Sequence, residues 1–228
     1  MKKMVIRALC FVPCALCLLL GAGVARAESI GEVEYWDSYA EKTYKSSASY
    51  TYSLTAETTT LSNGCWYVVD GEVTINHTIQ LENKAYIILK DGAKLTVNGD
   101  GSCHPGILVR YGSSNNDDLY IYGQDLGTGE LIANGGPNAP GIGGGYMYNN
   151  YPAAWQYGGN VYIYGGRVTA MGGNGAANIG AGCCYVGDNK GTLTLGERVL
   201  KFDNSHWAEW VTASFRIPDG LRLGSART

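Results

Sequence analysis

The residues best suited to bind a ligand lie in an aromatic segment at positions 146–157. The candidate ligand-binding side chains are Tyr146, Tyr148, Tyr151, Trp155 and Tyr157. Aromatic rings pack on the C–H faces of sugars, and the asparagine and glutamine amides between them can satisfy sugar hydroxyls. We predict that this segment is a loop that contacts a glycan or a peptide. The alternative is that its rings fold back over the protein as a small core of their own.

Metal-ligating residues are scattered along the chain. After position 27 the cysteines are Cys65, Cys103, Cys183 and Cys184, and none shows the C-x-x-C spacing of a zinc site. Residues 115–118 (NNDD) offer carboxylate and amide oxygens to calcium, but a polar turn before a strand has the same composition. We therefore predict no metal ion and no cofactor.

Two segments of the chain repeat each other, one starting at position 119 and the other at position 161. Residues 119–123 (LYIYG) align with 161–165 (VYIYG), and residues 129–133 align with 166–170 once a short insert is set aside. Each unit alternates apolar residues with threonine, tyrosine or a charged residue. This alternation predicts short strands with one buried face and one exposed face.

Weaker copies of the same unit recur at nearly half that offset, as from Val73 to Leu95. The repeats show no helical periodicity, so parallel strands would have to stack without crossover helices. We therefore predict an all-β fold, a right-handed parallel β-helix with terminal caps. The glycine cassettes at 141–145 and 178–182 would form its corners, because neither carries the Lys-Ser/Thr pair of a phosphate-binding loop. An antiparallel sandwich with similar turns is the alternative.

Carboxylates that could cleave a sugar chain are few in these repeats. Polysaccharide-cleaving enzymes need two carboxylates in one cleft, or calcium with a nearby base. The candidates are Asp118, Asp125 and Glu130, and the repeat aligns Glu130 with Arg167. This alignment predicts an exposed ion pair between neighbouring coils, and we predict no catalytic residue.

Positions 1–27 have the pattern of a cleavable signal peptide. A short basic segment precedes the apolar stretch at 8–20, and the small-x-small motif at 25–27 follows. The apolar core is too short to span a bilayer comfortably, so we predict cleavage before Glu28 and a mature chain that is secreted or displayed at the cell surface, without a membrane span. In that compartment the four remaining cysteines allow three disulfide pairings, and the sequence leaves all of them open.

Removal of this segment takes away four of the 17 basic residues and none of the 20 acidic ones, so the mature chain carries a net charge of about −7. An acidic chain without a basic run argues against nucleic acid as a partner. We expect a leader or cap at 28–60, the repeat domain at 61–196, and a cap or tail at 197–228, because the ends of a solenoid need covering.

The order of motifs along positions 50–195 is also informative. The runs at 64–75 and 86–96, the strand at 119–124 and the GIGGG cassette resemble those of bacterial secreted, glycine-rich right-handed β-helix repeat proteins of gut and oral anaerobes. The resemblance implies the β-helix fold and a surface location. It implies no catalytic residues, because the group has no shared catalytic motif. The chain departs from this group at Cys65, in the aromatic segment, and in the tail after position 196.

These observations together favour a non-catalytic adhesin or glycan-binding protein whose partners are host or bacterial glycans. Two alternatives stay open: a polysaccharide lyase or glycoside hydrolase on the same fold, and a structural spacer within a surface assembly. The ligand and the oligomeric state are not determined by the sequence.

Overall fold

The fold is known from a computed structural model of the chain, which describes residues 28–37, 41–111, 116–145, 157–174, 176–182, 192–203 and 212–213. All regular structure in these residues is β, and most strand pairs are parallel. None of them forms a long apolar helix of the kind that crosses a membrane. The predicted all-β fold is therefore confirmed, and the parallel pairing shows that the antiparallel sandwich was the wrong alternative.

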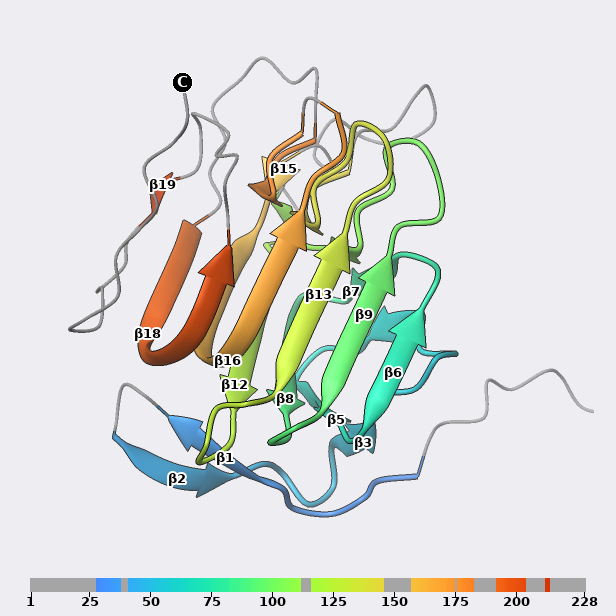
Figure 1. The fold of residues 1–228 in the computed structure, drawn as a ribbon. Helices are drawn as coiled ribbons and strands as arrows, with labels where there is room; N and C mark the ends of the chain where they lie inside the picture. Colours follow the sequence, from blue (N-terminus) through green and yellow to red (C-terminus); the bar gives the residue numbers. More distant parts are fainter. Residues whose placement is uncertain are drawn as a thin grey trace, which may run out of the picture.

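The strands form three stacks (Figure 1). We call a run of chain that contributes its strands to the successive stacks a coil. Within a stack, each strand pairs with the equivalent strand of the next coil. Stack A contains β3 (Thr51–Ser53), β5 (Cys65–Val69), β8 (Lys84–Leu89), β12 (Asp118–Gly123) and the first half of β16 (Asn160–Met171). Stack B contains β6 (Glu72–Ile75), β9 (Lys94–Asn98), β13 (Glu130–Asn134) and the second half of β16. Stack C contains β4 (Thr60–Leu61), β7 (Ile79–Leu81), β10 (Ile107–Leu108), β14 (Ile142–Gly143) and β17 (Ile179–Gly180).

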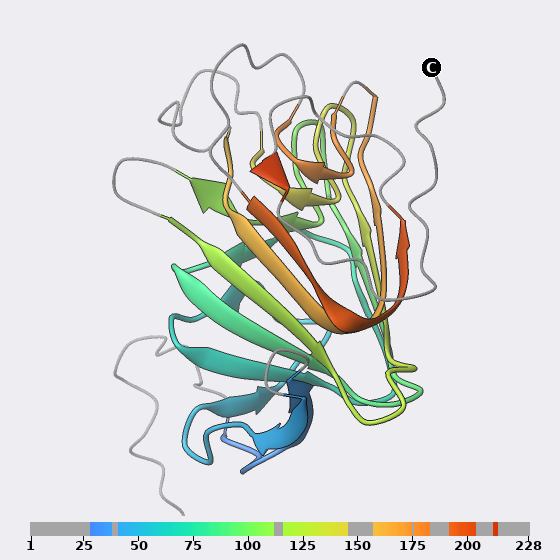
Figure 2. The same ribbon diagram turned by 90° about the vertical axis from the view of Figure 1, so that its left-hand side faces the viewer.

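Stacks A and B belong to one ten-stranded sheet, which bends where β16 passes from one stack to the other. The sheet is curled, with the outline of a half-barrel (Figure 2). The long strand β18 (Thr192–Asp203) pairs with β16 along both stacks, and β19 (Thr212–Ala213) pairs with β18. Two antiparallel pairs complete the fold: β1 (Glu34–Asp37) with β2 (Lys42–Lys45), and β11 (Arg110–Tyr111) with β15 (Tyr157–Gly158).

The register of the strands follows the sequence alignment. Leu119 pairs with Val161 across the longer repeat offset, and Val73 pairs with Leu95 across the shorter one. Because side chains alternate along a strand, this register places equivalent apolar residues in continuous rows inside the protein. One such row runs through Tyr67, Ile87, Ile121, Ile163 and Leu195, all of them buried. Each buried aliphatic side chain contributes about 1.5–3 kcal/mol to the hydrophobic stabilisation.

The glycine cassettes allow adjacent coils to approach each other closely. Gly143 and Gly180 are paired in stack C with φ values of 141° and 140°, which side-chain-bearing residues rarely adopt. A Cβ atom on Gly143 would collide with the backbone oxygen of Gly180. The cassettes are thus tight-packing positions of the strand stack.

The β1–β2 hairpin packs on the outer face of stack A. The Tyr35 ring contacts the rings of Trp66 and Tyr122 at centroid distances of 4.7 and 4.5 Å. The Gln124 side-chain amide also donates to the backbone oxygen of Glu34, over 3.0 Å. Strands β3 and β4 already belong to the stacks, so the stacks begin at Thr51, within the segment expected to be a leader or cap.

Candidate functional site

Most of the candidate ligand-binding residues of the aromatic segment lie outside the described residues. This applies to Tyr146, Tyr148, Tyr151 and Trp155, and to the side chain of Tyr157, whose backbone begins β15. The described residues show where the segment leaves the fold and where it returns. It follows Gly145, just after β14, and it returns in β15, which pairs with β11. The binding role of these five residues remains a prediction.

A pocket with a volume of about 450 Å³ lies on the outer side of stack C. We call it the groove, because residues from successive coils line it: Thr59, Thr60, His77, Thr78, Gln80, Asp100, Cys103, His104, Pro105, Leu108 and Gly145. Thr60 of β4, Gln80 of β7 and Leu108 of β10 pair in register and form one row of its floor. Alternation along these short strands sends Leu61, Leu81 and Ile107 into the core and leaves this row facing outward.

The loop after β9 forms one wall of the groove and carries an aspartate–histidine pair. Nδ1 of His104 lies 2.6 Å from the Asp100 carboxylate, and each side chain is 45% exposed. The hydrogen bond from His104 lowers the pKa of Asp100 below its ordinary value. A carboxylate only accepts hydrogen bonds, so we assign the ring proton to Nδ1. Nε2 of the neutral ring is then an acceptor that a ligand can use.

A second imidazole, that of His77, lines the groove from the segment just before β7. Nε2 of His77 lies 3.2 Å from the backbone oxygen of Thr58. Since that oxygen can only accept, Nε2 carries the proton and Nδ1 is the remaining acceptor. The neighbouring Thr78 hydroxyl donates to the backbone oxygen of Pro105 over 2.7 Å and so ties β7 to the wall loop.

Cys103 lines the groove next to His104, in the left-handed region with φ of 69°. The polar contact of its thiol is with the Ser102 hydroxyl, at 3.6 Å, and not with His104. A nucleophilic cysteine would need a base within hydrogen-bonding reach, so this geometry is not that of a cysteine–histidine pair. No disulfide joins Cys103 to Cys65, which is buried in β5.

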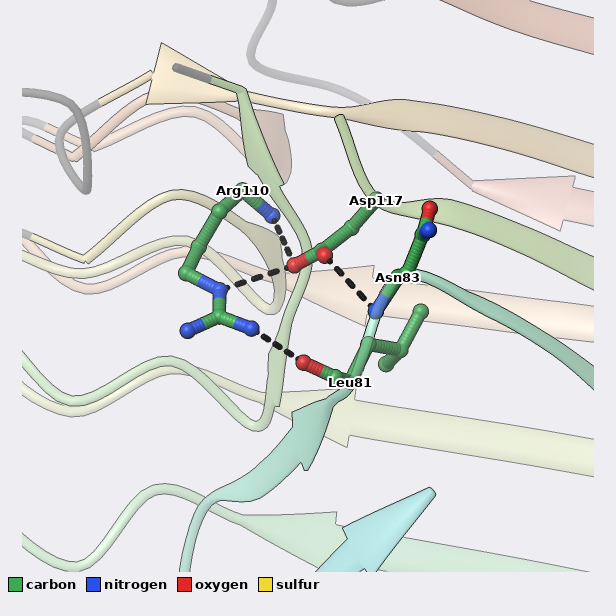
Figure 3. A network of polar contacts seen from close by, with 4 residues as sticks. All are labelled: Leu81, Asn83, Arg110 and Asp117. Carbon is green, nitrogen blue, oxygen red and sulfur yellow. Dashed lines mark hydrogen bonds and ion pairs between the residues drawn. The ribbon is translucent and has the colours of Figure 1, made fainter. Parts of the chain in front are cut away.

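The acidic run at 115–118 holds a buried ion pair instead of a calcium site (Figure 3). The Asp117 side chain is fully buried, and its Oδ2 accepts from the backbone nitrogen and Nε of Arg110 at 2.8 and 2.9 Å. Oδ1 accepts from the backbone nitrogen of Asn83 at 3.1 Å. Arg110 also donates to the backbone oxygen of Leu81. Both carboxylate oxygens are thus engaged by the protein, and they do not suit a calcium ion.

Burial raises the pKa of Asp117, and the hydrogen bonds from Arg110 act in the opposite direction. Arg110 and Asp117 lie next to Tyr111 and Asn116, which form an antiparallel β-bridge. The ion pair therefore joins the two antiparallel chain segments at this point. No feature of the sequence pointed to Arg110, because its partner follows later in the chain, across a turn. We refer to this network as the Arg110–Asp117 clasp.

Of the other predicted acidic residues, Asp118 and Glu130 join neighbouring coils, whereas Asp125 is exposed in the loop between β12 and β13. Asp118 accepts from the side-chain amide of Asn160 over 2.8 Å. Glu130 is in register with Arg167, as the alignment requires, but its ion pair is with Lys94 of the preceding coil, at 3.5 Å. The predicted Glu130–Arg167 ion pair was therefore wrong: Glu130 lies between two cations in its row, and the alignment considered only one of them.

A ladder of stacked rings runs along the outer face of stack A. It consists of Trp66, Tyr86, Tyr120 and Tyr162, with centroid distances of 4.2, 5.2 and 4.4 Å between successive rings. The outer two pairs are nearly parallel, with interplanar angles of 11° and 7°. The rings therefore cover one another's faces, and the ladder is better suited to stabilising the coils than to stacking on sugars. The repeated tyrosine at the same strand position was its signal in the sequence.

No protein-family model, no curated protein and no solved structure matches this chain. The resemblance to secreted β-helix repeat proteins is thus supported by the motifs of the sequence alone. The groove is a concave site of the described residues in which several polar side chains converge, and a second, smaller pocket of about 350 Å³ is lined by residues that include Thr55, Asp70 and Glu72.

Proposed function

We propose that this protein is an exported, non-catalytic binding protein that recognises glycans at the cell surface, and that its parallel stacks form a right-handed β-helix. The stacking of short parallel strands without helices supports the proposed β-helix. The signal-peptide pattern of positions 1–27 supports export.

The observation that carries the binding proposal is the lining of the groove. Sugar hydroxyls both donate and accept hydrogen bonds, and the groove offers threonine hydroxyls, a glutamine amide and two imidazole acceptors. In the described part of the chain, the Thr60 hydroxyl and the Gln80 side-chain amide make no hydrogen bond, so a ligand can use them. Leu108 and Pro105 also line the groove, and both are buried, so the polar side chains supply the groove's contacts with a ligand.

The position of the aromatic segment in the chain supports the same proposal. Gly145 lines the groove, and the aromatic segment follows directly after it in the chain. We propose that Trp155 and its tyrosine neighbours contribute ring faces to the same ligand. If so, Trp155→Ala should weaken glycan binding by about 1–3 kcal/mol, on the scale of aromatic stacking on nucleobases, with little change in thermal midpoint. A loss of about 3–5 kcal/mol of stability instead would identify Trp155 as a core residue.

Binding is favoured over cleavage by the carboxylates of the groove. Among the described lining residues Asp100 is the one carboxylate, and it is engaged with His104. Glycoside hydrolases use two carboxylates on either side of the scissile bond. The groove therefore has the partners for recognition without the pair that hydrolysis requires.

A glycan array probed with the mature protein, residues 28–228, tests the proposal. We expect binding to a defined set of glycans and no release of reducing ends or unsaturated products from pectins and mucins. An array without any bound glycan would contradict the proposed function, and product release would replace it with an enzymatic one.

A further inference from the structure

We infer that the groove selects an uncharged, linear oligosaccharide that lies across the coils, in preference to a single sugar or an acidic glycan. This inference rests on the proposed function and names the ligand class of the same groove.

The length of the ligand follows from the order of the coils. Thr60, Gln80 and Leu108 come from three successive strands of stack C, and Gly145 comes from the coil after them. Neighbouring strands lie about 4.8 Å apart, so the lining spans about 14 Å along the stack. A pyranose residue of an extended chain advances by about the same length as one strand spacing. The groove can therefore hold about one sugar residue for each strand spacing, which makes about three of them.

The volume agrees with that length. The groove measures about 450 Å³, which falls within the range of pockets that enclose most of a small ligand. A single sugar ring would contact one coil and leave the polar residues of the others to water. Affinity should therefore rise with chain length until the groove is filled.

The charge of the ligand follows from the side chains that titrate in the groove. The described lining contains no lysine and no arginine, and its titratable groups are His77, Asp100, Cys103 and His104. A carboxylated sugar would thus meet the negative charge of Asp100 without a cation to pair with. The nearby Arg110 is held in the clasp by Asp117 and the backbone oxygen of Leu81. Neutral glycans would bring no further carboxylate next to Asp100 in a groove whose described lining has neither lysine nor arginine.

The hydrogen-bonding roles in the groove also suit a neutral polyol. The two assigned imidazole acceptors need donors, which sugar hydroxyls supply and a carboxylate does not. The Gln80 amide and the threonine hydroxyls can both donate and accept, so they adapt to whichever hydroxyl orientation the chain presents.

Calorimetric titration of the mature protein at pH 7.5 with two oligomer series tests this inference. The neutral series contains the sugar of the strongest neutral array hit as oligomers of one to six units, and the acidic series contains galacturonate oligomers of the same lengths. We expect the affinity for the neutral series to rise at least about tenfold from one unit to three and to level off beyond four. We expect galacturonate oligomers to bind at least about tenfold more weakly than neutral oligomers of equal length.

A charge substitution provides a gain of function as a second readout. Gln80→Lys places a cation on the floor of the groove and should raise the affinity for galacturonate oligomers at least about fivefold. Thr96→Lys, on the outer face of stack B, is the matched control and should change it less than about twofold. A monosaccharide that binds as tightly as the trimer, or a preference of the wild type for galacturonate, would overturn the inference while leaving glycan binding in place. Absence of binding to every glycan would instead remove the proposed function and this inference with it.

Discussion

The Asp117 carboxylate lies 2.9 Å from Nε of Arg110. Both side chains are buried: that of Asp117 has no exposed surface, and that of Arg110 is 10% exposed. The two residues hold the strand β11 against the start of β12. A buried charge is tolerated when its partner and its hydrogen bonds are in place, and it is costly when the partner is removed. The clasp is therefore a position at which a single substitution should strongly affect stability.

Asp117→Asn should lower the free energy of unfolding by about 3–5 kcal/mol, because it replaces the buried carboxylate that pairs with the Arg110 guanidinium by a neutral amide. Urea denaturation of the mature protein measures this change. Asp70→Asn is the matched control, since Asp70 pairs with Lys90 at 2.7 Å on the surface and should contribute about 0–1 kcal/mol. Equal costs for the two variants would contradict the role assigned to the clasp.

A row of asparagines on stack B ends with an unsatisfied acceptor. Asn98 donates to Asn76 and Asn134 donates to Asn98, at 2.8 and 2.7 Å. Among the described residues, Oδ1 of Asn134 is buried without a hydrogen-bond partner, and the next residue of the row is Met171. Met171→Asn should extend the row and raise the free energy of unfolding by about 1 kcal/mol.

Met171→Leu serves as the control for that substitution, since it keeps an apolar side chain and adds no donor. We expect it to leave the free energy of unfolding unchanged within about 0.5 kcal/mol. Urea denaturation of the two variants measures both changes. If the leucine variant were stabilised as much as the asparagine variant, packing and not the amide hydrogen bond would be the cause.

The half-buried Tyr35 side chain of the β1–β2 hairpin should make the stability of the protein fall as the pH rises above 10. Burial, and next the negative charge of Asp37, raises the pKa of Tyr35 from 10.0 to about 12. The folded protein thus holds this proton more tightly than the unfolded chain, so the stabilisation is fully present below pH 10 and is lost between about pH 10 and 12. Denaturation midpoints measured across this window should fall, and Tyr35→Phe should make the fall less steep. An identical pH dependence in the phenylalanine variant would show that Tyr35 does not contribute.

The repeat made much of the fold predictable from the sequence. Similar strands at a fixed offset have to pair in register to bury the same apolar positions, which is why Leu119 lies opposite Val161. The same reasoning placed Glu130 opposite Arg167 correctly but missed its ion pair with Lys94. An exposed charged side chain in such a row can form an ion pair with the residue on either side of it, and the backbone register alone does not determine which pair forms.

The groove could not be predicted in the same way. Its floor is formed by strands of two or three residues, which are too short for alternation to identify them as strands in the sequence. Its wall depends on a loop in which His104 reaches back to Asp100, and on coils that differ too much in sequence to align. The aromatic segment was recognisable by composition, yet its proximity to the groove at Gly145 required the three-dimensional structure.

Export is the part of the proposal that depends on sequence alone. Cleavage after Ala27 should release a chain that begins at Glu28. Mass spectrometry of the culture supernatant or of the detached cell surface measures the mass of the exported species. A species that retains positions 1–27 would contradict the assigned signal peptide.

The most direct test of glycan binding in the groove is a calorimetric titration of the strongest array hit into three proteins. These are the wild type, the groove variant Thr60→Ala/Gln80→Ala, and the control variant Thr96→Ala/Thr169→Ala, whose threonines lie on the outer face of stack B. Loss of two hydrogen bonds should weaken binding to the groove variant at least about fivefold, while the control variant binds like the wild type and all three melt at similar temperatures. Unchanged affinity in the groove variant, or an equal loss in the control variant, would contradict the assignment of the binding site to the groove.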